Sequence, residues 1–253
     1  MSRVRHRLTR AGLLRSLAGA VFAISFCPNL TAADKAAGDG GTIEGVVTYR
    51  ADSKRPWRYA RYYVKDRKAG QLAEAVVALS GKGLKKLAPS HRPATAVVDQ
   101  KNFTFIPETT AIRAGDRVKF LNSDKQLHNV QAFHLIHSFN VNMRAGGSHV
   151  ETFKGATGLR LPYRIGCVYH SAMRAWIFVL DHPYFQVTGK DGTFRLQNVP
   201  PGKYKLELKH PAGDLRWSRD VEVKAGAITR IDIRLSPDDK PKRRTPPKQG
   251  TKR

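Results

Sequence analysis

The segment RIGCVYHSAM (residues 164–173) brings together three side chains that bind soft metal ions. Cys167, His170 and Met173 follow one another at intervals of three residues. A thiolate, an imidazole and a thioether together suit copper. A blue copper site needs two imidazoles and one thiolate close to one plane, with a methionine as a weak axial ligand. The segment supplies three of these four groups, so a second histidine must come from another part of the chain.

The best candidate for that histidine is His128, in the segment NSDKQLHNV (122–130). It follows a predicted strand, 117–121, by a short turn. We therefore expect it on a loop at the same end of a sandwich as the cysteine loop. His134 and His137 are close to it in sequence, but the ligand set is complete without them. We expect surface positions for both, with a second metal site or a place at the rim of the first as the alternative.

The cysteine count adds to this interpretation. The chain has two cysteines, and Cys27 directly follows a short apolar run (17–26) that several arginines precede. This pattern is typical of a secretory signal peptide, and we expect residues 1–33 to be removed on export, with a retained signal anchor as the alternative. Cys167 would then have no partner for an intrachain disulfide, which leaves an intermolecular disulfide, a reactive thiol or a metal ligand. Zinc is disfavoured because a thioether is a poor zinc ligand.

The charge of the chain bears on its partners and its location. The formal net charge is +25 at pH 7, which favours acidic partners. Residues 237–253 are basic and lack large apolar side chains, so we expect a disordered tail there. The expected partner is a redox protein with an acidic surface, with an anionic envelope polymer or a glycan as the alternative, and no nucleic acid. The apolar run near the N-terminus is too short to span a bilayer, and we expect a periplasmic or extracellular protein with no membrane-spanning segment after export.

Short β-rich segments separated by Gly, Pro, Asn and Asp recur along the rest of the chain. Their alternation of apolar and polar residues predicts an all-β fold, a sandwich or a barrel, and helix is disfavoured throughout. Residues 50–73 show no clean alternation and are expected to form a charged connection. The predicted strands are 42–49, 74–79, 102–107, 117–121, 175–180, 192–196, 203–208 and 228–235.

Residues 94–180 resemble the cupredoxins, in particular the plastocyanin, pseudoazurin and amicyanin-like group. The similar segments are FIPETTAIRAGDRVKFLNSDKQLHNV and YRIGCVYHSAMRAWIFV. The resemblance implies a Greek-key β-sandwich that holds one type 1 copper ion. It implies His128, Cys167 and His170 as the strong ligands and Met173 as the axial one. It also implies that the Asn129 side chain hydrogen-bonds across to the other ligand loop, a contact that would hold the ligands in place.

A second resemblance surrounds the first. YFQVTGKDGTFRLQNVPPGKYKLELKH (184–210) is similar to the carboxypeptidase regulatory-like, or transthyretin-like, β-sandwich, whose superfamily includes carbohydrate-binding modules. The first strands of that family are matched before the cupredoxin segment, so we expect a discontinuous sandwich of residues 41–93 and 181–236. A domain inserted into a loop of another is physically easy when its two ends lie close together. The whole arrangement resembles secreted bacterial proteins described as methylamine-utilisation-like.

Three functions are compatible with these patterns, and the ligand set ranks them. One-electron transfer through Cu(II) and Cu(I) comes first, because all four expected ligands are present. A copper-binding protein, or one that attaches to the envelope or to carbohydrate through the outer sandwich, is the alternative. A copper enzyme would need further histidines, typically as His-x-His pairs, and the sequence has no such pair. We therefore do not expect an enzyme.

Overall fold

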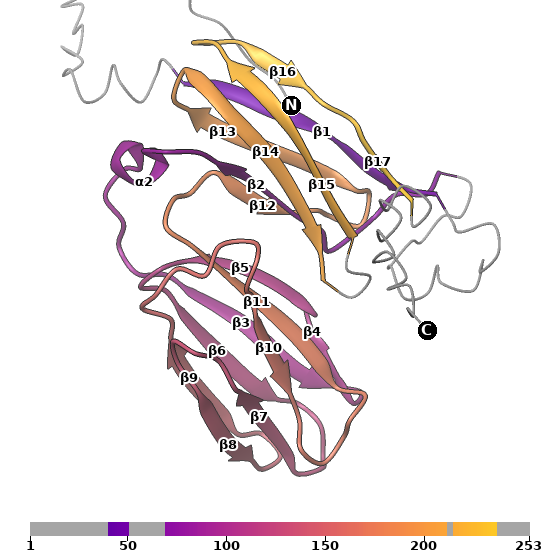
Figure 1. The fold of residues 1–253 in the computed structure, drawn as a ribbon. Coiled ribbons are helices and arrows are strands. Elements are labelled where there is room, and N and C mark those ends of the chain that lie inside the picture. Colours follow the sequence, from indigo (N-terminus) through magenta and orange to yellow (C-terminus); the bar gives the residue numbers. More distant parts are fainter. Residues whose placement is uncertain (1–39, 51–68, 212–214, 237–253) are drawn as a thin grey trace, which may run out of the picture.

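The computed structural model describes residues 40–50, 69–211 and 215–236. The expected signal peptide (1–33), the expected basic tail (237–253) and most of the expected charged connection lie outside the described residues. In the described part, strands β1 to β17 form four sheets, and the short helix α2 (Leu84–Leu87) accompanies them. The predicted all-β fold is confirmed. Figure 1 shows the strands as two stacked bodies.

The first sandwich is made of strands from both ends of the described chain. Its two sheets enclose one apolar core, to which β1 contributes Ile43 and Val47, β2 contributes Val77 and β14 contributes Leu206. One sheet contains β13 (Thr193–Val199), β1 (Gly41–Tyr49), β16 (Ile228–Arg230) and β17 (Ile233–Leu235); the other contains β12 (Phe185–Val187), β2 (Val76–Ser80), β14 (Gly202–His210) and β15 (Leu215–Val223).

The second sandwich contains the strands between these two groups, and it carries the candidate ligands. Val98 and Phe120 of one sheet share a core with Val130 and Ile177 of the other. One sheet has the order β5 (Thr109–Arg113), β11 (Arg174–Leu180), β10 (Tyr163–Gly166), β7 (His128–Ala132) and β8 (Phe139–Met143); the other has the order β4 (Thr104–Ile106), β3 (Thr95–Lys101), β6 (Arg117–Asn122) and β9 (Ser148–Thr152).

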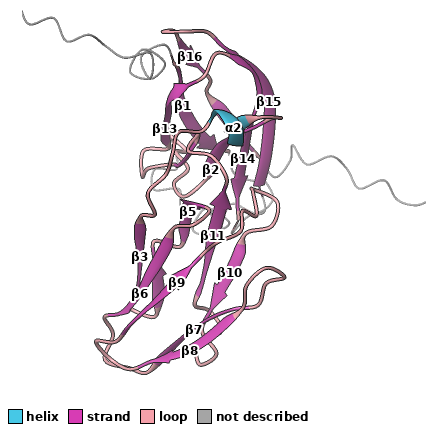
Figure 2. Cartoon of the chain, turned by 90° about the vertical axis from the view of Figure 1, so that its left-hand side faces the viewer, coloured by secondary structure: helices cyan, strands magenta, loops and turns pink. Residues whose placement is uncertain are grey.

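Strand β11 joins the two sandwiches. Its alternate residues face opposite ways, so that Ile177 lies in the core of the second sandwich while Phe178 and Leu180 pack against Val76 and Ala78 of β2. Both faces of β11 are covered, and its residues 175–180, AWIFVL, accordingly form a continuous apolar run. This shared cluster holds one end of the second sandwich against the first. In Figure 2 the two bodies follow each other along the length of the molecule.

The ends of several predicted strands differ from the structure, and two of the differences have a clear local cause. The segment 228–235 is divided into β16 and β17, although both pair with β1 in parallel and in one register. The interruption occurs where the Asp232 carboxylate accepts the Val46 N–H at 3.0 Å, in place of a main-chain oxygen. The predicted strand 102–107 is shortened to β4. Asn102 and Phe103 have φ values of 54° and 57°, so these two residues form the turn between β3 and β4.

No helix among the described residues is long and apolar enough to cross a membrane.

Candidate metal centre

The three strong candidate ligands lie at one end of two neighbouring strands of the second sandwich and in the loop that follows one of them. His128 is the first residue of β7, and Cys167 directly follows the last residue of β10. The two strands are antiparallel, with Gly166 opposite Gln131, so the chain that leaves β10 runs towards the beginning of β7. His170 follows in the loop that leads to β11. We expected His128 on a loop; instead it begins a strand, because it pairs with Met143 of β8.

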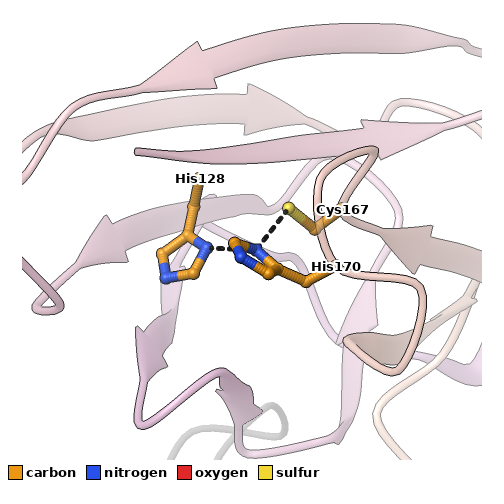
Figure 3. A group of neighbouring side chains, drawn as sticks. All are labelled: His128, Cys167 and His170. Carbon is orange, nitrogen blue, oxygen red and sulfur yellow. Dashed lines mark hydrogen bonds between the residues drawn. The ribbon is translucent and has the colours of Figure 1, made fainter. Parts of the chain in front are cut away.

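The side chains of these residues converge on one point, as Figure 3 shows. Nδ1 of His128 lies 3.1 Å from Nδ1 of His170, and the sulfur of Cys167 lies 3.7 Å from the same His170 nitrogen. Among the histidine, cysteine and carboxylate side chains of the described ranges, His128, Cys167 and His170 form a group close enough to share a metal ion. Their candidate ligand atoms all lie within 4.8 Å of one another. His128 is fully buried, Cys167 is buried, and His170 is partly exposed.

The thiol of Cys167 is held by the main chain of the neighbouring strand. The N–H of Asn129 donates a hydrogen bond to the sulfur at 3.3 Å. A hydrogen bond from the main chain to a ligand sulfur stabilises negative charge on it and tunes the metal that it binds. The strand that begins with His128 therefore also orients the Cys167 sulfur.

Met173 is buried at the end of the same loop. Its N–H donates to the His170 carbonyl at 2.9 Å, which closes a tight turn between the two residues. Its side chain belongs to the same apolar core cluster as Cys167. The structure thus places this thioether in the interior beside the loop, in surroundings that exclude water.

The Asn129 side chain connects both ligand segments with a third strand. Its amide nitrogen donates to Oδ1 of Asn140 at 2.6 Å and to Oδ1 of Asn142 at 3.2 Å, both on β8. Its amide oxygen accepts the Val168 N–H at 3.4 Å, a long hydrogen bond to the loop after Cys167. Asn142 also accepts the hydroxyl of Tyr169. These contacts tie β7, β8 and the cysteine loop together.

Sequence reasoning missed a carboxylate behind His128. Oδ2 of Asp124 lies 2.8 Å from Nε2 of His128, the ring nitrogen that does not face the other candidate ligands. Burial would raise the pKa of Asp124, but it is outweighed by hydrogen bonds from the Phe103 N–H, from His128 and from the Asn102 N–H, and the pKa is lowered. The carboxylate therefore stays ionised and fixes the orientation of the ring. Its position four residues before His128 was the available signal.

Phe103 is a second residue that the sequence did not indicate. Its ring meets the imidazoles of His128 and His170 edge-on, with centroids 5.5 and 5.0 Å away. Phe103 is held there by the β3–β4 turn, whose N–H groups donate to the Asp124 carboxylate. It is 45% exposed, so it covers the two imidazoles on the solvent side.

The other histidines of this sandwich have separate contacts. His134 stacks on Tyr163 with ring centroids 4.0 Å apart. His137 and His149 both contact the carboxylate of Glu151, at 2.8 and 2.6 Å. None of the three belongs to the His128 group.

The donor set fits copper. Two imidazole nitrogens and one thiolate form the trigonal set of a blue copper site, and a buried thioether follows the last histidine in the chain. The fixed orientation of His128 and the hydrogen-bonded sulfur are the outer contacts that such a site requires.

Comparisons with known proteins give partial likenesses. No family model and no curated protein matches the chain. Amicyanin from Paracoccus versutus is 21% identical, with a TM-score of 0.30, over 41% of this chain and 96% of that one. A mutant of amicyanin in the Cu(I) form is 17% identical, with a TM-score of 0.31, over 41% of this chain and 97% of that one. A purple cupredoxin from Nitrosopumilus maritimus is 18% identical, with a TM-score of 0.29, over 33% of this chain and 98% of that one.

Each likeness covers less than half of this chain.

Proposed function

We propose that the second sandwich is a cupredoxin-type domain that binds one copper ion at a type 1 site and transfers single electrons. The observation that carries the proposal is the convergence of His128, Cys167 and His170 within 4.8 Å, with the sulfur already accepting a main-chain hydrogen bond. Two imidazoles and a thiolate in this arrangement are typical of blue copper electron-transfer sites. Met173 would be the weak axial ligand.

Bound copper would supply a one-electron Cu(II)/Cu(I) couple. Contacts within the chain would hold the ligands in place: Asp124 orients the His128 ring, the Asn129 N–H orients the sulfur, and the Met173 turn shapes the loop. A preformed ligand set changes little between the two oxidation states, which favours rapid electron exchange. The buried side of the site excludes water.

The electron would pass through His170. It is the partly exposed member of the group, and exposed apolar side chains lie near it in the chain or in space: Phe103, Leu127, Val168 and Tyr169. An apolar rim of this kind allows a partner protein to approach closely after desolvation. The charge of +25 supports a partner with an acidic surface.

Two further parts of the proposal rest on sequence. The N-terminal pattern of residues 1–33 supports export to the periplasm or the extracellular space. The motifs of residues 184–210 support a carboxypeptidase regulatory-like assignment for the first sandwich.

The test is a visible absorption spectrum recorded while Cu(II) is added to the purified protein. The proposal expects an intense charge-transfer band in the visible region that ascorbate bleaches and air restores. Cys167→Ser and His128→Ala should lose the band. His149→Ala is the matched control, because His149 lies outside the ligand group, and it should keep the band.

Two outcomes would count against the proposal. Copper bound equally by the parent protein and Cys167→Ser would mean that the thiolate is no ligand. An intact band with copper that passes to a chelator within minutes would favour copper capture over electron transfer.

A further inference from the structure

The second sandwich carries an exposed apolar patch away from its ligand residues, which we call the apolar knuckle: Phe133, Leu135, Ile136 and Leu161. The exposed fractions of these side chains are 76%, 94%, 52% and 49%. Isolated exposed apolar residues are common on soluble proteins, but a group of large ones marks a surface that contacts another molecule. The proposed copper site makes no use of these residues.

The knuckle is formed by two loops that pack together. Residues 133–138 connect β7 to β8, and residues 153–162 connect β9 to β10. His134 Nε2 lies 3.2 Å from the Leu161 carbonyl oxygen. Gly155 lies so close to Ile136 that an added Cβ would be 2.9 Å from a side-chain carbon of Ile136. The two loops that carry the four apolar side chains therefore lie against each other.

The first of these loops is fixed by its own hydrogen bonds. The Ser138 hydroxyl accepts the His134 N–H and donates to the His134 carbonyl, both at 3.0 Å. The Ile136 N–H donates to Nδ1 of His134. The polar side chains of the loop are therefore used internally, while Phe133 and Leu135 project outward. A fixed loop loses little conformational entropy when its apolar side chains are buried by a partner.

Basic side chains lie in the second loop of the knuckle and directly after it. Lys154 and Arg160 are exposed and lie in the second loop, and Arg164 is exposed two residues after it. Neither loop sequence contains aspartate or glutamate. The nearby Glu151 carboxylate is hydrogen-bonded to two histidines. The second loop therefore adds cations to the apolar side chains, on a protein whose formal charge is +25.

We propose that the apolar knuckle inserts into the surface of an anionic lipid membrane. Projecting aromatic and aliphatic side chains beside Lys and Arg suit the boundary between acyl chains and acidic headgroups. The side chains protrude from loops, as insertion into a lipid layer requires.

Membrane binding in this position leaves the metal centre accessible. The knuckle begins directly after the last residue of β7, whereas His128 is the first residue of that strand. Four strand steps separate the two ends, which is about 13 Å. Leu161 likewise precedes β10, and Cys167 follows it. The knuckle and the candidate ligands are therefore at opposite ends of the same two strands.

Tryptophan fluorescence in the full chain tests the proposal. Phe133→Trp places a reporter in the knuckle, and Ile228→Trp is the matched control, because Ile228 is an exposed residue of the first sandwich. The probes are vesicles of phosphatidylglycerol and phosphatidylcholine in equal parts, and vesicles of phosphatidylcholine alone. We expect a blue shift for Phe133→Trp with the anionic vesicles, and quenching when their acyl chains are brominated. The control should show neither change.

Vesicle sedimentation completes the test. Phe133→Ser/Leu135→Ser should weaken binding to the anionic vesicles by about tenfold or more, because two large apolar side chains are removed. Lys154→Gln/Arg160→Gln should also weaken it, and a Val97→Ser control should not. Equal binding by the parent and Phe133→Ser/Leu135→Ser would overturn the proposal and assign any adhesion to charge elsewhere. A dimer of the parent protein that these serine substitutions dissociate would also overturn it, because the knuckle would then contact a second copy.

Discussion

Asp124 and His128 form a carboxylate–imidazole pair behind the candidate metal centre, with Oδ2 and Nε2 2.8 Å apart. The pair lies almost entirely inside the protein: His128 has no exposed side-chain surface, and Asp124 has 10%. The same carboxylate accepts the N–H groups of Asn102 and Phe103. One side chain therefore orients a ligand and fixes the turn whose aromatic ring covers it.

Replacing Asp124 should weaken copper binding. In Asp124→Asn the charge behind His128 is lost, so the imidazole becomes a poorer donor and the turn at Asn102 is held less firmly. We expect Cu(II) affinity to fall about 10- to 100-fold, the range found for outer contacts of metal sites. Competition with a chelator of known affinity measures this. Asp191→Asn is the control, since Asp191 holds a turn in the first sandwich; an affinity loss of equal size there would contradict the prediction.

Phe103 should slow the escape of the metal. Phe103→Gly removes the ring that meets both imidazoles, so we expect transfer of copper to a chelator to become several-fold faster. The fold should not suffer, because glycine adopts the positive φ of this turn without the cost of about 1 kcal/mol that a side chain carries.

Urea unfolding measures the stability of Phe103→Gly, and chelator kinetics measure its rate of copper release. Asn198→Gly is a matched control for the backbone term, since Asn198 also has a positive φ and lies in the first sandwich. It should leave the rate of copper release unchanged. Unaltered release from Phe103→Gly would show that the ring is no barrier.

The Asn129 side chain should matter for the stability of the fold more than for the visible absorption band of the copper site. Asn129→Ala keeps the main-chain N–H that binds the Cys167 sulfur but loses three side-chain hydrogen bonds in a buried position. We expect a loss of about 1–3 kcal/mol in the free energy of unfolding, with the visible band retained. Asn140→Ala, which changes an exposed partner of the same amide, should cost less. A band abolished by Asn129→Ala with stability intact would reverse the assignment.

Glu108 should make the metal-free protein less stable above neutral pH. Burial raises the pKa of Glu108 to about 7, and the nearby charge of Arg174 only partly offsets this. Since the folded state binds this proton more tightly than the unfolded one, stability should fall as pH rises from about 4.5 to 7.

Glu108→Gln should remove this loss. We expect the variant to exceed the parent by about 1 kcal/mol at pH 8, a value reduced for the partial exposure of the side chain. Urea midpoints at pH 5 and pH 8 measure it. Glu222→Gln, at an exposed position of β15, is the control. The same pH slope for the parent and Glu108→Gln would exclude this origin.

The sequence by itself determined the fold class and the types of the candidate ligands. Alternating apolar residues and frequent turn residues predicted strands, and a local pattern suffices for this because the two faces of a strand differ in burial. The spacing of Cys167, His170 and Met173 predicted a soft metal loop. His128 was chosen because it follows a predicted strand by a short turn, and the resemblance to cupredoxins supplied the expected roles.

Only the tertiary structure decided which distant residues complete the centre. Asp124 reaches the His128 ring because it lies in the turn that leads into β7. Phe103 covers the same ring because the β3–β4 turn of the other sheet lies beside it. The break between β16 and β17 likewise depends on Asp232 meeting Val46 far away in the chain. Such contacts follow from strand pairing and register, which join segments that a local pattern treats separately. The chemistry was therefore readable from side-chain type, whereas the arrangement that tunes it required the packed sheets.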